Sequence, residues 1–212
     1  MSGWRGLALL ALLAGPAAAA VCDPHAALND QARAQHAAKN LAAARASVQK
    51  VLASDKSDFR ANYLLGIIMA DESGVERPGG GDGAKIKAAL AQLDFTVSLF
   101  AAIDPACARA KNYASVFNSA GAEHFNAGDY AGAINYLLQG YAKRDMMAAT
   151  TQQKLLSNLG RVYYTKHDYR SAAHYYDEAA KAGAPSADRN RDAANELAAL
   201  TAPKKMAPVG RK

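Results

Sequence analysis

The sequence has few aromatic residues and no long alternation of β-branched with polar residues. Aromatic residues make up 8% of the 212 residues, and only one of them is tryptophan. Because a half-buried strand needs alternation of Val, Ile or Thr with polar residues, the sequence predicts no β-sheet. Alanine dominates the 50% hydrophobic fraction, and alanine favours helix. The composition therefore predicts an all-α fold.

A set of residues with catalytic or metal-binding spacing is also missing. The five histidines form no His-Glu-x-x-His pair, the spacing that places two imidazoles on one helix face around zinc. In the glycine-rich segment 77–85, Lys85 precedes Ile86, whereas a phosphate loop has Ser or Thr after its lysine. We therefore expect a flexible loop here, and a protein that is not an enzyme and binds neither cofactor nor metal.

The positive charge is concentrated at the C-terminal end. The formal net charge is +6, and much of it lies in the segment 202–212. This basic tail contains Lys204, Lys205, Arg211 and Lys212. Because no basic stripe runs along the rest of the chain, nucleic-acid binding is not expected. The tail is expected to be disordered, with contact to an acidic membrane or polymer surface as the alternative.

The first twenty residues have the composition of a secretory signal peptide. Arg5 is followed by the apolar segment 6–20, which ends in small alanines suited to cleavage near Ala20. The apolar run is about 15 residues and contains Gly15 and Pro16, so it is shorter than the roughly 20 residues of a membrane-spanning helix. We expect an exported, periplasmic protein whose mature chain has no integral membrane segment; a single membrane anchor is the alternative.

Two cysteines in an exported chain raise the question of a disulfide. Cys22 lies directly after the expected cleavage site, and Cys107 lies in the middle of the chain. One alternative is that the two are far apart and Cys107 is a small buried residue. Another is an outer-membrane lipoprotein with lipidated Cys22, which is disfavoured because Val21 is larger than the residue that lipoprotein processing normally takes. The sequence leaves the three possibilities open.

Two helical segments break and resume in the same way. The breaks are Gly128-Asp129-Tyr130 and His167-Asp168-Tyr169, with Gly121 and Gly160 seven residues before them. A left-handed turn residue followed by an N-capping Asp is the pattern of a tight turn between antiparallel helices. We expect Ala133 and Ala172 to be buried where each pair crosses, against Gly121 and Gly160 respectively.

This pattern resembles the tetratricopeptide repeat (TPR), a helix–turn–helix unit of 34 residues. Departures from the family pattern are His124 in place of a tyrosine, Gly140 in place of a small alanine, His167 in place of the turn glycine and an offset of 39 residues between the copies. The matching residues are Gly121, Gly128, Asp129, Tyr130, Ala133 and Ile134 in one copy and Leu159, Gly160, Tyr163, Asp168, Tyr169, Ala172, Tyr176 and Ala179 in the other.

The resemblance implies an all-α, right-handed α-solenoid of TPR-like helix pairs with a C-terminal capping helix. Weaker copies precede the two clear ones, and a loop interrupts the second copy. The expected repeat domain covers residues 25–201, with repeats at about 25–58, 59–105 (inserted loop 73–83), 106–147 and 153–186 and a capping helix at 186–200.

In this family the first helix of each pair lines the binding surface, so the resemblance also suggests partner-binding residues. They combine cations with flat aromatic rings and amides, which suits an extended peptide with acidic and apolar side chains. The alternative is that they solvate this face or contact the capping helix. The candidates are Arg33, Arg60, Tyr63, Asn118, Phe125, Lys154, Arg161 and Tyr164.

We therefore expect a scaffold that binds a protein or peptide partner during cell-envelope assembly or secretion. One alternative is an accessory factor or hydrolase acting on cell-wall polymer, with Asp71 and Glu72 beside the inserted loop as the acids. Another alternative is a lipid-anchored envelope assembly factor. The sequence does not specify an oligomeric state.

Overall fold

A computed structural model describes residues 22–75 and 80–201 of the protein. This part of the chain contains ten α-helices, two short 3₁₀ helices and no β-strand, so the predicted all-α class is confirmed. The expected signal peptide (1–20), the basic tail (202–212) and residues 76–79 of the expected inserted loop lie outside the described residues.

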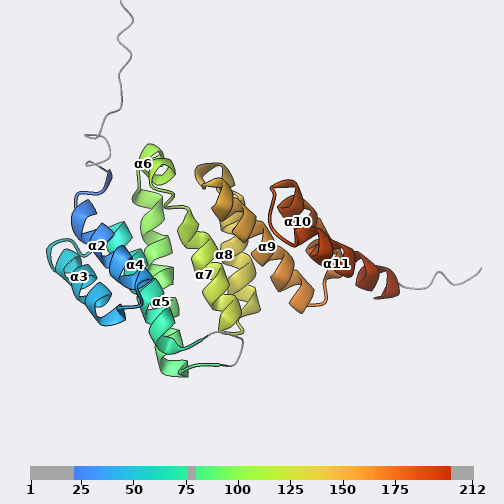
Figure 1. The fold of residues 1–212 in the computed structure, drawn as a ribbon, viewed down its shortest axis with the longest axis horizontal. Helices are drawn as coiled ribbons and strands as arrows, with labels where there is room; N and C mark the ends of the chain where they lie inside the picture. The colour runs from blue at the N-terminus through green and yellow to red at the C-terminus, as the bar shows by residue number, and fades with distance from the viewer. Residues whose placement is uncertain (1–21, 76–79, 202–212) are drawn as a thin grey trace, which may run out of the picture.

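The helices follow one another along the long axis of the molecule, from α2 and α3 at one end to α11 at the other (Figure 1). The α-helices are α2 (Ala26–Ala37), α3 (Leu41–Ser54), α4 (Phe59–Ser73), α5 (Gly83–Leu99), α6 (Pro105–Ala110), α7 (Ser115–Asn126), α8 (Tyr130–Tyr141), α9 (Ala149–Thr165), α10 (Tyr169–Lys181) and α11 (Ala187–Thr201), and the 3₁₀ helices are η1 (Phe100–Ala102) and η2 (Arg144–Met146).

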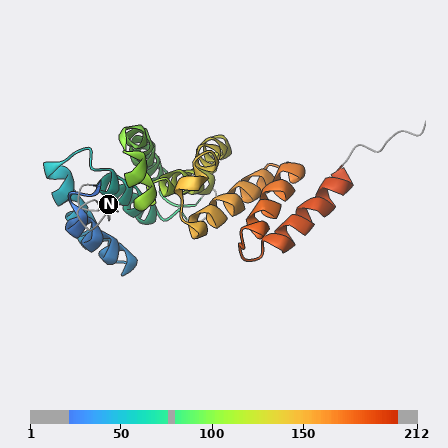
Figure 2. The same cartoon turned by 90° about the horizontal axis from the view of Figure 1, so that it is seen from above.

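Neighbouring helices pack in sequential pairs, which are α2 with α3, α4 with α5, α7 with α8, and α9 with α10. The first helices of the pairs also contact one another, α2 with α4, α4 with α7 and α7 with α9. Each second helix packs against the helix that opens the next pair, and α10 packs against α11. We call α2, α4, α7 and α9 the first-helix row. The view from above shows the same elongated order (Figure 2).

The same tight turn joins the two helices in three of the pairs. A residue with positive φ, between 60° and 83°, directly follows the C-cap of the first helix. The next residue caps the second helix and accepts a hydrogen bond from a backbone N–H three residues on, at 2.9–3.2 Å. Its own N–H donates to the carbonyl five residues back, at 2.9–3.0 Å, which satisfies the end of the first helix. The successive residue pairs are Lys39–Asn40, Gly128–Asp129 and His167–Asp168.

A glycine on the first helix lets the second helix approach closely. A Cβ atom added at any of these glycines would lie too close to a large side chain on the second helix, so even alanine would force a shift. The nearest distances would be 2.7 Å from Leu93 Cδ2 at Gly66, 2.5 Å from Leu137 Cγ at Gly121 and 2.6 Å from Tyr176 Cδ1 at Gly160.

The burial of the two alanines after the turns agrees with the sequence, but their expected partners need correction. Ala133 and Ala172 are both fully buried. The atoms nearest to Gly160, however, belong to Tyr176, and Gly121 faces Leu137 as well as the Ala133 carbonyl. The large residue lies one helical turn after the alanine in both cases, because side chains four residues apart share a helix face.

The pair α4–α5 has a longer connection than the others. Gly66 and its neighbour Leu93 are 27 residues apart, whereas Gly121 and Leu137 are 16 apart. At the base of this connection the Asp82 N–H donates to the Ser73 carbonyl at 2.8 Å. Asp82 also caps α5. The two ends of this connection, Ser73 and Asp82, therefore lie next to each other.

The glycine contact predicts a specific stability effect. We expect Gly121→Ala to lower the free energy of unfolding by about 1–3 kcal/mol, because the new methyl group overlaps Leu137. Gly83→Ala is the matched control, since nothing lies within 4 Å of a Cβ at that position. Urea unfolding followed by circular dichroism compares the two. Equal midpoints would show that the helices do not approach as closely as described.

Candidate partner-binding surface

The eight candidate binding residues all lie on helices of the first-helix row. Their side chains do not form one cluster but fall into an N-terminal end, a polar middle and a C-terminal end. By helix they are Arg33 on α2, Arg60 and Tyr63 on α4, Asn118 and Phe125 on α7, and Lys154, Arg161 and Tyr164 on α9.

Lateral hydrogen bonds connect the middle of the row. The Tyr63 hydroxyl lies 2.7 Å from the Ser119 hydroxyl, and Asn158 Nδ2 donates to Asn118 Oδ1 at 2.9 Å. Within the described residues, Asn118 Nδ2 and Asn158 Oδ1 have no further side-chain partner. An amide donor and an amide acceptor are thus held side by side, and they can bond the N–H and C=O groups of an extended peptide.

At the C-terminal end of the row, a cation lies over an aromatic ring. The Arg161 guanidinium carbon is 4.3 Å from the centre of the Phe125 ring. Phe125 is only 7% exposed, so Arg161 and not the ring forms the surface here. Burial lowers the pKa of Arg161, and burial raises the pKa of Glu123, which precedes Phe125 by two residues on α7. Two partly desolvated charges in one region are a recognised sign of a binding site.

Lys154 lies at a separate cleft beside α9. This cleft has a volume of ≈ 450 Å³ and lies between α9 and the turn that joins α10 to α11, where Ala184 and Pro185 form its other wall. Tyr164 is directed elsewhere, because its ring packs against Tyr169 with the centres 5.4 Å apart. Tyr164 therefore packs within the pair α9–α10, a contact that the sequence did not predict.

At the N-terminal end of the row, Arg60 is held by two carboxylates. Its guanidinium donates to Asp23 at 2.6 Å and to Asp30. Asp23 is 2% exposed. Burial lowers the pKa of Arg60, but the hydrogen bonds to Asp23 and Asp30 outweigh burial and raise it. A cleft of ≈ 330 Å³ opens beside this group, between α2, α4 and the segment 110–115.

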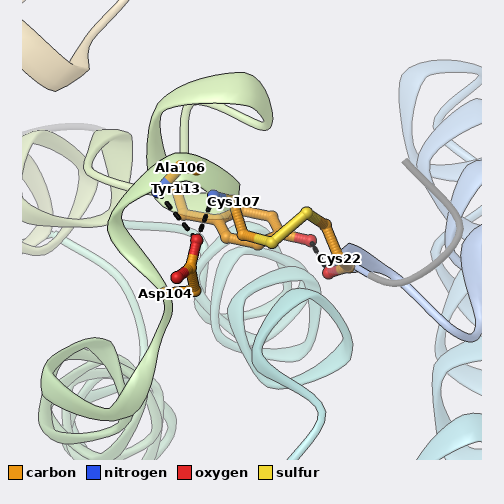
Figure 3. The surroundings of a disulfide bond; sticks show 5 residues. All are labelled: Cys22, Asp104, Ala106, Cys107 and Tyr113. Carbon is orange, nitrogen blue, oxygen red and sulfur yellow. Dashed lines mark hydrogen bonds between the residues drawn. A yellow bond between two sulfur atoms is a disulfide. The ribbon is translucent and has the colours of Figure 1, made fainter. Parts of the chain in front are cut away.

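A disulfide closes the N-terminal end. Cys22 and Cys107 are bonded, with their Cα atoms 5.2 Å apart and a sequence separation of 85. Asp104 caps the short helix α6 by accepting from the Cys107 N–H at 3.1 Å, and the Tyr113 hydroxyl donates to the Cys22 carbonyl at 3.3 Å (Figure 3). Burial raises the pKa of Tyr113 to about 12, so this hydroxyl stays protonated and able to donate at neutral pH.

Sequence reasoning missed a charged group that joins two helix pairs. His124 lies between two carboxylates, with Nε2 3.0 Å from Asp94 and Nδ1 2.8 Å from Asp129. Each ring nitrogen thus lies within hydrogen-bonding distance of one carboxylate, so His124 connects Asp94 of α5 with Asp129 at the start of α8. The departure from the family pattern at position 124 was the available signal, but the partner Asp94 is thirty residues away.

Another cluster that the sequence did not reveal is His25, Asp55 and Asp58. Each offers one ligand atom, and these atoms lie within 4.8 Å of one another. Both carboxylates also have local structural partners, since Asp58 accepts from the Ala61 N–H at 2.7 Å and Asp55 from the Ser57 N–H at 2.9 Å. Turn formation therefore accounts for their positions without a metal ion.

Two further findings bear on the nature of the protein. Comparison with known proteins identifies no family that matches the chain and no curated protein that is significantly similar to it. Of the helices within residues 22–75 and 80–201, none has the length and apolar character needed to cross a membrane.

The group around His124 predicts a pH dependence of stability. The Gly132 N–H and then the His124 ring hold the pKa of Asp129 below its ordinary value of 3.8. Because the pKa of Asp129 is lower in the folded state than in the unfolded state, its ionised carboxylate stabilises the fold above pH 3.8. This stabilisation is lost as the pH falls through the folded-state pKa. As the pH is lowered below 3.8, we expect the melting temperature of the unaltered protein to fall more steeply than that of the Asp129→Asn variant. Parallel curves for the two proteins would contradict this prediction.

Proposed function

We propose that the protein is an exported helical scaffold that binds an extended segment of a protein partner along the first-helix row, in cell-envelope assembly or secretion. The observation that carries the proposal is the amide pair Asn118–Asn158, held between α7 and α9 at 2.9 Å and flanked by cations at both ends of the row. Hydrogen bonds to a peptide backbone combined with outlying charges suit recognition of an extended chain.

The recurring turn supports assignment to the TPR-like α-solenoids. Lys39–Asn40, Gly128–Asp129 and His167–Asp168 have the same backbone conformation, although Lys and His replace glycine in two of them. Right-handed stacking of such pairs gives an extended binding surface. The helix α11, which packs on α10, then corresponds to the capping helix.

The disulfide supports a location outside the cytosol. Bonds between cysteines persist in oxidising compartments such as the periplasm, and Cys22 is bonded to Cys107. The same bond argues against the lipid-anchored alternative, because lipidation would need the Cys22 sulfur that the disulfide occupies. Export to the periplasm after cleavage near Ala20 remains our proposal.

The alternative of a polymer hydrolase has less support. Asp71 lies 3.0 Å from His36 and 3.3 Å from Lys39, and Glu72 is ion-paired with Arg45. Carboxylates engaged in this way stabilise the packing of α4 on α2 and α3. They do not converge on a substrate as the acid and base of a hydrolase must.

The experiment that tests this proposal is affinity capture from envelope extracts with two charge-reversal variants. We expect the unaltered protein to retain a reproducible protein partner and Arg161→Glu to lose about tenfold or more in affinity, because reversal leaves a repulsive charge beside Glu123. Arg170→Glu is the matched control, since Arg170 is an exposed residue of α10 outside the row.

Two results would count against the proposal. The first is the absence of any reproducible protein partner from every envelope fraction. The second is equal retention by Arg161→Glu and Arg170→Glu, with both variants folded by circular dichroism. That result would place the binding surface away from α7 and α9.

A further inference from the structure

We infer that the cleft at the N-terminal end of the row binds the carboxylate side chains of an acidic segment, and that the Cys22–Cys107 disulfide holds this cleft in its binding shape. We call it the disulfide cleft. The inference rests on the proposed function, since it names the chemistry of the ligand at one end of the row and the covalent bond on which that end depends.

The side chains that line the disulfide cleft are mainly cationic and polar. Three cations (Arg33, Arg60 and Lys111) and one anion (Asp30) face its space of ≈ 330 Å³. Tyr63, Tyr113, Asn112 and Ser115 also line this space. Even with the buried Asp23 behind Arg60 counted, positive charge remains in excess. Carboxylate is the complementary ligand because guanidinium binds it with paired, directed hydrogen bonds.

An internal carboxylate already occupies part of the cleft. Asp30 accepts from Arg60 and lies 3.4 Å from Arg33. The Arg60 hydrogen bond, with the nearby charges of Arg33 and Lys111, holds the pKa of Asp30 below its ordinary value. All three cations therefore act on one carboxylate position. Asp30 is 56% exposed, so a carboxylate of the ligand can compete with it from solvent.

The disulfide connects the two segments that position the cations. On one side, Cys22 precedes Asp23, whose buried carboxylate holds Arg60 at 2.6 Å. On the other side, the Cys107 carbonyl accepts from the Lys111 N–H at 3.0 Å. The Tyr113 hydroxyl bridges back to the Cys22 carbonyl at 3.3 Å (Figure 3). Cutting the bond therefore frees Asp23 from α6 and loosens both walls of the cleft.

The test measures binding of a fluorescein-labelled hexaglutamate peptide with blocked ends by anisotropy, with the hexaglutamine peptide as the uncharged probe. We expect the oxidised protein to bind hexaglutamate and not hexaglutamine, and reduction to weaken binding about tenfold. A dithiol provides the two electrons and two protons that convert the disulfide to two thiols, and is itself oxidised to a disulfide.

Four single variants, one of them a control, separate the effect of charge from that of the disulfide. Arg60→Gln should weaken hexaglutamate binding about tenfold, while Arg170→Gln, the matched loss of an exposed arginine on α10, should not change it. Asp30→Asn should strengthen binding several-fold, because it removes the competing carboxylate. Asp23→Asn keeps the disulfide but loses the anion that holds Arg60, so it should weaken hexaglutamate binding. This variant tests the position of Arg60 even if reduction of the disulfide unfolds helices, as judged by circular dichroism.

Failure of this inference is distinguishable from failure of the proposed function. Equal hexaglutamate affinity of the oxidised protein and its reduced form, both folded, would overturn the dependence on the disulfide. No binding to the oxidised protein, or an Asp30→Asn variant that binds less tightly than the unaltered protein, would overturn the carboxylate site. Neither result bears on the capture of a partner through Arg161, which tests the proposed function. Conversely, loss of the partner from Arg161→Glu alone does not bear on the disulfide cleft.

Discussion

The fold depends on the tight turn between paired helices. At Lys39, Gly128 and His167 the backbone enters the left-handed region, and the following Asn or Asp caps the next helix. This turn fixes the point at which the second helix starts, and so determines which of its side chains meets the glycine on the first. The contact of Gly121 with Leu137, which a Cβ would bring to 2.5 Å, then sets the spacing within the pair. The first-helix row is the result of this spacing in successive pairs.

Specific polar contacts determine how the pairs are placed next to one another. His124 joins α7 to Asp94 of α5 at 3.0 Å, and Asn118 joins α7 to Asn158 of α9 at 2.9 Å. At the N-terminal end the disulfide adds a covalent bond between segments 85 residues apart in sequence. Removal of one partner from a buried polar pair leaves the other unsatisfied, which costs more than the pair contributes. These contacts therefore make the arrangement specific as well as stable.

The sequence was informative where structure is local. Asp129 and Asp168 after a turn residue predicted tight turns between paired helices, and the alanine-rich composition predicted an all-α fold. The contact between Tyr176 and Gly160 could not be predicted, because it depends on the angle at which α9 and α10 cross, and no local sequence pattern specifies that angle. The bond between Arg60 and Asp23 was not predictable either, since it joins residues 37 apart through a loop whose path depends on Cys107. The sequence did not decide whether Cys22 and Cys107 pair, because only the distance between them in the folded chain determines this.

The scaffold role that we propose depends on two features of the first-helix row, which are amides that can bond a peptide backbone and charges at both ends. The most direct measurement is site-specific photocrosslinking in envelope extracts. A photoreactive residue at Asn118 lies on the row, and one at Leu138, which is 37% exposed on α8, lies on a second helix. Our account predicts a discrete crosslinked partner from position 118 and none from position 138. The reverse result, with crosslinking from position 138 alone, would contradict the claim that the row is the binding surface.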